Sequence, residues 1–125
     1  MLTVLNLIAA KKINREFIEP GPELTETYTN HWQRLMEDGS IADLARPFYD
    51  MNVEPFWELA PRHGVTLPGG EIYTMEKLQK FYLGARIDHE LFKLSLMEPL
   101  RRKLQNTLIS TYFDQERRRG QIYFI

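Results

Sequence analysis

The chain has 125 residues, enough for one domain with its own core, and its 43% hydrophobic and 26% charged residues are typical of a globular rather than a disordered protein. It contains no cysteine, which excludes disulfides, thiolate metal ligands and a cysteine nucleophile and fits a reducing, cytoplasmic location. The net charge of −1 argues against an indiscriminate nucleic-acid binder.

The charge is unevenly distributed along the chain. Residues 1–100 carry 10 Lys and Arg against 15 Asp and Glu, a net of −5, whereas residues 101–125 carry 6 against 2, a net of +4. A basic face of this kind can neutralise phosphates. It is equally typical of a solvated helix end, where cations interact favourably with the helix dipole.

The first elements are a core helix and a short strand. Residues 2–11 are apolar nearly all round, too short to span a bilayer and not preceded by a basic segment, so they predict a buried helix and no membrane association. Alternation at Ile13, Phe17 and Ile18 predicts a short strand, stopped by the turn at residues 20–22.

An amphipathic helix is predicted from about Glu23 to Glu37, ending at Asp38-Gly39. Its apolar residues recur at helical spacing on one face: Leu24, Tyr28, Trp32, Leu35 and Met36. His31 lies beside that face, and a packed, hydrogen-bonded histidine is the simplest interpretation of such a position. Residues 41–44 predict one further helical turn.

Residues 46–59, "RPFYDMNVEPFWEL", contain four large aromatic residues and two prolines. Burying each Phe or Trp is worth roughly 1.5 to 3 kcal/mol, so this segment must be packed. We expect two short strands joined by a turn at Val53-Glu54-Pro55, because proline cannot donate a ladder hydrogen bond and biases the preceding residue towards an extended conformation.

The second half is predicted to be mainly helical. After a loop with a turn at Pro68-Gly69-Gly70, Leu67 and Ile72 are expected to extend the small sheet. Thr74 and Asp88 are predicted N-caps of two successive helices. Their inward residues are Met75, Leu78 and Tyr82 in the first, and Leu91 and Phe92 in the second. A last helix from about Pro99 to Phe113 has Leu104, Leu108, Ile109 and Tyr112 on its buried side.

The predicted fold is α+β and mainly helical, with winged-helix-like helices packed on a small antiparallel β element. We expect one domain over residues 1–113, followed by a basic tail or edge strand over residues 114–125. The final "QIYFI" is an apolar strand that would pair with the chain's own sheet or with a second copy in a homodimer.

Three stretches together resemble a known family. They are "NREFIEPGPELTETYTNHWQRLM", "LARPFYDMNVEPFWELAPRHG" and "EKLQKFYLGARIDHELFKLSLMEPLRRKLQNTLISTYF". In the same order they resemble the N-terminal DNA-recognition regions of bacterial HNH-type restriction endonucleases, whose relatives include sulfur-binding domains that recognise phosphorothioate DNA. The resemblance covers about residues 1–113 and implies a domain that binds duplex DNA.

The catalytic part of such enzymes has no counterpart in the sequence. His31, His63 and His89 are far apart, and none has the context of an HNH motif or the spacing of a zinc protease. Glu71, Glu76 and Lys77 only weakly resemble a nuclease pattern, and there is no phosphate-binding glycine loop or serine elbow. We therefore predict a binding module that is not an enzyme and holds no metal or cofactor.

The resemblance implies where DNA would be bound. In sulfur-binding domains a Tyr-Pro pair in an apolar pocket receives the sulfur; the pair corresponds here to Arg46-Pro47, so the proline matches and the tyrosine does not. Arg46 can hold a phosphate through its guanidinium, while Asp50 would repel one. The predicted DNA-contacting residues are Arg46, Pro47, Tyr49, Asn52, Arg62 and His63.

Two other functions fit the same residues. A protein-interaction or scaffold module that kept the fold and lost the DNA site is favoured by Asp50 and by the acidic first hundred residues. The non-catalytic half of a split restriction nuclease, working with a separately encoded nuclease, is the third candidate.

Overall fold

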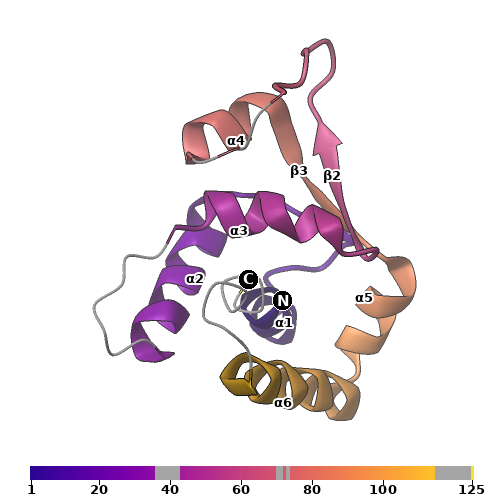
Figure 1. Ribbon diagram of the computed structural model, residues 1–125. Coiled ribbons are helices and arrows are strands. Elements are labelled where there is room, and N and C mark those ends of the chain that lie inside the picture. The colour runs from indigo at the N-terminus through magenta and orange to yellow at the C-terminus, as the bar shows by residue number, and fades with distance from the viewer. Residues whose placement is uncertain (36–42, 70–71, 73, 115–124) are drawn as a thin grey trace.

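The computed structural model describes residues 1–35, 43–69, 72, 74–114 and 125. Within them the chain is an α+β fold, mainly helical, whose helices pack on a three-stranded antiparallel sheet (Figure 1). The elements follow in the order α1 (Leu2–Ala9), β1 (Phe17–Ile18), α2 (Pro22–Leu35), α3 (Ala45–Asp50), the 3₁₀ helix η1 (Met51–Val53), β2 (Trp57–Pro61), α4 (Met75–Phe81), β3 (Tyr82–Ile87), α5 (His89–Leu96) and α6 (Glu98–Asp114). None of the described helices is long and apolar enough to cross a membrane.

Helix α1 lies at the centre of the molecule, as its apolar sequence predicts (Figure 1). Val4 and Leu5 are almost completely buried, and the polar Thr3 is buried with them. At the N-terminal end of α1, the Val4 N–H donates to the main-chain oxygen of Ile125 at 2.5 Å, and Ile125 is itself fully buried. The last residue of the chain therefore satisfies an N–H that α1 cannot bond internally.

Helix α2 begins one residue before its predicted start, with Pro22 in the first turn, where its missing N–H costs nothing. Leu24, Tyr28 and Trp32 are all buried, as their helical spacing predicts. Met36 and the predicted helix end at Asp38-Gly39 lie outside the described residues.

The sheet has the order β1-β3-β2. In the register of the three strands, Ile18 lies opposite Ala85 and Ala85 opposite Leu59, and all three are buried, so this face of the sheet covers the core. Phe17, Arg86 and Glu58 form the neighbouring row on the other face, since successive side chains of a strand point to opposite sides.

Two sequence predictions are wrong in this region. Residues 45–50 form a helix rather than a strand, because Pro47 occupies the first turn, where a proline removes no helical hydrogen bond. The helix capped by Thr74 ends at Phe81, and Tyr82 begins β3, which the sequence analysis did not predict.

The predicted extension of the sheet by Leu67 and Ile72 is also wrong. Neither Leu67 nor Ile72 belongs to a strand, because β2 pairs with β3 instead. The remainder of the predicted final strand, residues 121–124, lies outside the described part of the chain.

The order of elements agrees with the predicted winged-helix-like arrangement. A helix, a short strand and two helices are followed by an antiparallel pair of strands, and the central strand is the last in the sequence. The loop between β2 and β3 corresponds to the wing and also contains α4, which lies beside the upper part of the two strands (Figure 1). Helix α3, followed by η1, comes directly before this pair of strands.

Candidate nucleic-acid interface

Helix α3 is held rigidly against the sheet. Ala45, Pro47, Phe48 and Met51 are buried beneath it. The Phe48 ring packs edge-on against the Trp57 ring with 5.0 Å between centroids, and the indole Nε1–H of Trp57 donates to the Phe48 carbonyl at 3.0 Å. Since both partners are buried, these contacts fix the orientation of α3 relative to β2.

The outer side of α3 and η1 carries several of the predicted site residues. Arg46 and Asn52 are exposed, and Tyr49 is half-buried. Val53, at the end of η1, is 77% exposed. A guanidinium and a carboxamide are the groups that bond phosphates and adenine edges, respectively, in protein–DNA complexes.

Arg46 is not isolated on this surface. Its Nε lies 3.6 Å from Oδ2 of Asp50, one helical turn later, and both side chains are about half exposed. An exposed pair at this spacing contributes only a few tenths of a kcal/mol, so a phosphate can compete for the arginine. Asp50 nevertheless places a negative charge beside the position that the phosphate would occupy.

Pro47 is buried in the structure and so does not form the exposed apolar surface implied by the family resemblance. Its ring lies on the core side of α3, where it supports the helix. A sulfur atom on DNA would therefore have to be met by other side chains.

Tyr49 connects α3 to the central strand. Its ring lies 6.1 Å from the ring of Tyr82, at an angle of 55°. Burial, together with Tyr49, raises the pKa of Tyr82, so its hydroxyl keeps its proton at neutral pH.

Arg62 and His63 lie where β2 passes into the wing, in a segment, residues 61–69, that is exposed throughout. The main-chain N–H of Arg62 donates to the main-chain oxygen of Phe81 at 2.8 Å. The side-chain Nε–H of Arg62 donates to the main-chain oxygen of Gln79 at 2.5 Å. These bonds anchor the arginine to the C-terminal end of α4. They use only one of the guanidinium nitrogens, which leaves the two Nη groups of the fork as donors for a ligand.

Helix α4 adds cations that the sequence analysis did not assign to the DNA site. Lys77 and Lys80 are exposed on it, and the ammonium of Lys80 lies 5.5 Å from the centre of the Phe81 ring. Helix α4 also contacts α3. The spacing of three residues between the two lysines, on a helix capped by Thr74, was the signal available in the sequence.

The structure thus separates the predicted residues into two groups. Arg46, Tyr49 and Asn52 belong to α3 and η1, while Arg62 and His63 belong to the base of the wing. Glu71, from the weak nuclease pattern, lies outside the described residues. No cluster of three His, Asp or Glu side chains suited to a metal ion occurs among the residues that the structure describes.

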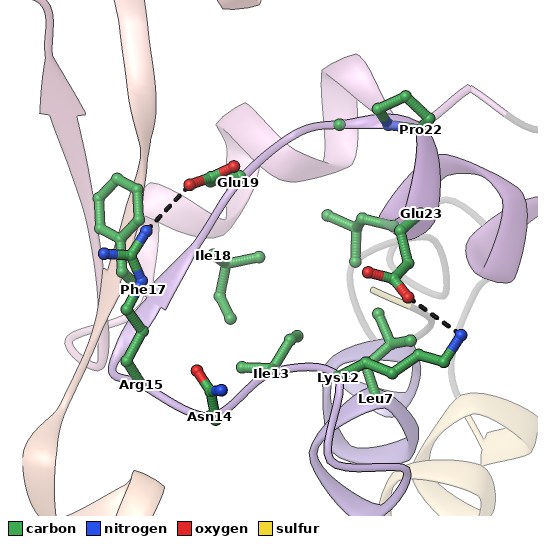
Figure 2. Close-up of a pocket in the computed structure, with 12 residues that line it drawn as sticks. Leu7, Lys12, Ile13, Asn14, Arg15, Phe17, Ile18, Glu19, Pro22 and Glu23 are labelled. Atoms are coloured by element: carbon green, nitrogen blue, oxygen red, sulfur yellow. Dashed lines mark hydrogen bonds and ion pairs between the residues drawn. The ribbon is translucent and has the colours of Figure 1, made fainter.

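A pocket near the sheet edge lies between the α1–β1 loop and the start of α2 (Figure 2). This cavity of about 360 Å³ has an apolar floor that includes Leu7, Ile13 and Ile18. Lys12 pairs with Glu23 at 3.1 Å on one side, and Arg15 pairs with Glu19 at 2.9 Å on the other. Both of its cations are paired with carboxylates, as Arg46 is with Asp50.

No protein-family model matches the chain, and no curated protein matches it.

Proposed function

We propose that the chain is a non-catalytic module that binds duplex DNA through α3, η1 and the base of the wing, in the manner of the specificity domains of HNH-type restriction endonucleases. The observation that carries the proposal is the position of α3. It precedes the β2–β3 pair and is fixed to it by Phe48 and Trp57, and its outer side exposes Arg46, with Asn52 exposed on the η1 turn that follows. This arrangement suits a helix that enters the major groove.

Exposed cations on α4, which contacts α3, and on the wing segment support the same proposal. Arg62, Lys77 and Lys80 lie on the wing segment and α4, and each is exposed. In the proposed complex these side chains bind the phosphate backbone and fix the register, while Asn52 and Arg46 reach the base edges or the nearest phosphates. A cytoplasmic location and a separately encoded nuclease partner belong to this proposal.

The experiment is a fluorescence-anisotropy titration of one duplex in unmodified, base-methylated and phosphorothioate forms. Arg46→Ala is expected to weaken binding about tenfold, because it removes a charge-assisted phosphate or base contact. Asp50→Asn is expected to tighten binding several-fold, because it removes a repulsive carboxylate beside that contact.

Arg102→Ala is the matched control. Arg102 is also an exposed helical arginine paired with a carboxylate one turn away, Glu98 at 2.7 Å, but it lies on α6. Its substitution should leave DNA binding unchanged. If Arg102→Ala weakened binding and Arg46→Ala did not, the DNA would be bound by the basic part of α6 and the proposed site would be wrong.

A protein-interaction module is the second candidate. It is favoured by the Arg46–Asp50 pair, which reduces the positive charge of α3, and by the exposed side chain of Val53. Failure of every duplex form to bind in the titration would favour this function over DNA recognition.

A further inference from the structure

Strand β1 is an edge strand of the sheet, because the order β1-β3-β2 places β3 on one side of it and no described strand on the other. The Ile87 N–H donates to the Glu16 carbonyl at 3.1 Å, and the next residue, Phe17, lies opposite Arg86. In an antiparallel ladder, residues that bond to the neighbouring strand alternate with residues whose main chain faces the other way. The N–H and C=O of Phe17 therefore point away from β3, towards the free edge.

The free edge of β1 borders the cavity of about 360 Å³ between the α1–β1 loop and α2 (Figure 2). Ile13 and Ile18 point into this cavity, and the buried side chains of Leu7 and Leu24 complete its floor. Its volume is at the lower end of the range for ligand pockets, so it suits an apolar side chain rather than a large ligand.

Both walls of the cavity are fixed by hydrogen bonds. On the side of the α1–β1 loop, the N–H groups of Lys12 and Ile13 donate to the Leu7 carbonyl at 2.9 and 3.2 Å. On the side of α2, the Gln79 amide donates to the Pro20 carbonyl at 2.6 Å. Since the walls are held in this way, a ligand would pay little to order them.

The other face of β1 carries a charge pattern. Arg15, Phe17 and Glu19 follow one another at alternate positions and lie together on this face (Figure 2). The Arg15 guanidinium lies 5.4 Å from the centre of the Phe17 ring and 2.9 Å from the Glu19 carboxylate, and both charged side chains are about two-thirds exposed. The free edge thus presents a cation, an aromatic ring and a carboxylate in that order, which a neighbouring strand can match.

We propose that the free edge of β1 binds an extended peptide segment of a protein partner, which joins the sheet as a fourth strand. The antiparallel direction is expected, because that pairing is the more stable one per residue and lets one partner residue exchange two hydrogen bonds with Phe17. The inference uses no residue of the proposed DNA site and does not depend on DNA binding.

The register defines the chemistry of the partner segment. Side chains that lie opposite each other in two paired strands share a face of the sheet. The residue opposite Glu19 is therefore basic, and the residue opposite Ile18 is apolar and enters the cavity. The residue opposite Phe17 is aromatic, and the residue opposite Arg15 is acidic. From its N-terminus the segment has a basic, an apolar, an aromatic, an unspecified and an acidic residue.

The test uses a heptapeptide with capped ends and this order of side chains, Thr-Lys-Leu-Tyr-Thr-Glu-Thr, titrated into the ¹⁵N-labelled full chain and followed by NMR. The amide signals of residues 16–19 should shift and saturate, with a dissociation constant in the micromolar to millimolar range. The Phe17 amide proton should move downfield, because it gains a hydrogen bond. No shift of these amides at millimolar peptide would overturn the proposal.

Two altered peptides separate strand pairing from other modes of binding. Methylation of the tyrosine main-chain nitrogen should weaken binding at least tenfold, because it removes the donor to the Phe17 carbonyl. Aspartate in place of the leucine should weaken binding to a similar extent, because it puts a charge on the apolar floor of the cavity. A methylated peptide that binds as tightly as the parent would show that no strand is added, and would overturn the proposal.

Charge reversal in the protein tests the register. Arg15→Glu and Glu19→Lys should each weaken binding of the parent peptide several-fold, and the double variant should prefer a peptide whose lysine and glutamate are exchanged. Arg102→Glu is the matched control, because Arg102 is also an exposed arginine paired with a carboxylate one helical turn or four residues away, but it lies on α6. It should bind the parent peptide as the wild type does. A folded double variant that still prefers the parent peptide would overturn the proposed strand.

Discussion

His31 of α2 belongs to a hydrogen-bond network that joins three helices. Its Nε2 accepts from the Asn6 amide of α1 at 3.1 Å, so its Nδ1 carries the proton and donates to Thr3 Oγ1 at 3.0 Å. The Asn6 carbonyl oxygen accepts from Gln105 of α6 at 2.6 Å, which fixes the orientation of the Asn6 amide. A protonated imidazole has no acceptor to offer Asn6, so this network requires neutral histidine.

The network predicts a pH dependence of stability. Burial, with a smaller effect of Arg34, lowers the pKa of His31. The stabilisation is therefore complete above the unfolded pKa of about 6.5 and is lost as the pH falls below it, because the unfolded chain takes up the proton first. Between about pH 7.5 and pH 5 the wild type should lose more stability, measured by urea unfolding, than His31→Gln. Equal losses in the two proteins would show that His31 is not held in its neutral form.

Lys11 has a positive φ of 61°, in the left-handed region. It follows the C-terminus of α1, where its N–H donates to Ile8 and the Lys12 N–H donates to Leu7, which is the Schellman pattern. Glycine adopts this conformation without a Cβ penalty, so Lys11→Gly should raise the free energy of unfolding by about 1 kcal/mol. Ala10→Gly, at a neighbouring residue with a φ of −80°, should lower it. Loss of stability in both variants would rule out strain at Lys11.

Strand β3 is the central strand of the sheet. Its residue Gly84 permits β3 to approach β1 closely. A Cβ on Gly84 would lie 2.2 Å from the Ile18 carbonyl oxygen and 2.9 Å from the Phe17 ring. Gly84→Ala should therefore destabilise the fold by about 3 kcal/mol, because β1 must move away from β3. Gly69→Ala, with no atom within 4 Å of its Cβ position, should be nearly neutral in the same denaturation experiment. A neutral Gly84→Ala would show that β1 is not held against β3 at this position.

Elements specified by local chemistry were predictable from the sequence. Thr74 accepts from the Lys77 N–H, and Asp88 accepts from the Leu91 N–H, so both predicted helix caps are confirmed. Strand β3 was not predictable by periodicity, because Tyr82 lies one helical turn beyond Leu78 and Gly84 interrupts the alternation of large apolar residues. The aromatic residues of α3 indicated burial correctly but suggested a strand, since propensity is weaker than tertiary packing.

In the candidate site, the types of the residues predicted which side chains are exposed, but not on which elements they lie. Arg46, Asn52, Arg62 and His63 are all exposed, as expected for contacts with a ligand. Pro47 is buried within α3, whereas the resemblance implied a proline that lines an apolar pocket open to DNA. The lysines of α4 were not assigned to the candidate site because no local pattern in the sequence specifies that α4 contacts α3.

At the scale of the whole molecule, the fold presents two different surfaces at its two ends. The part with α3, α4 and the wing carries Arg46, Arg62, Lys77, Lys80 and Asn52, and the end with α5 and α6 carries five of the nine exposed large hydrophobic residues of the described chain (Figure 1). A net charge of −1 provides little general attraction to DNA, so the proposed binding requires a small number of local phosphate contacts.

The most direct test of DNA recognition is the dependence of the affinity for duplex DNA on salt concentration. Contacts from Arg46, Arg62, Lys77 and Lys80 predict that the logarithm of the association constant falls linearly with the logarithm of the salt concentration, with a slope of about −3 to −4. An affinity that does not change with salt, or the absence of binding at low salt, would contradict the account and favour a protein partner.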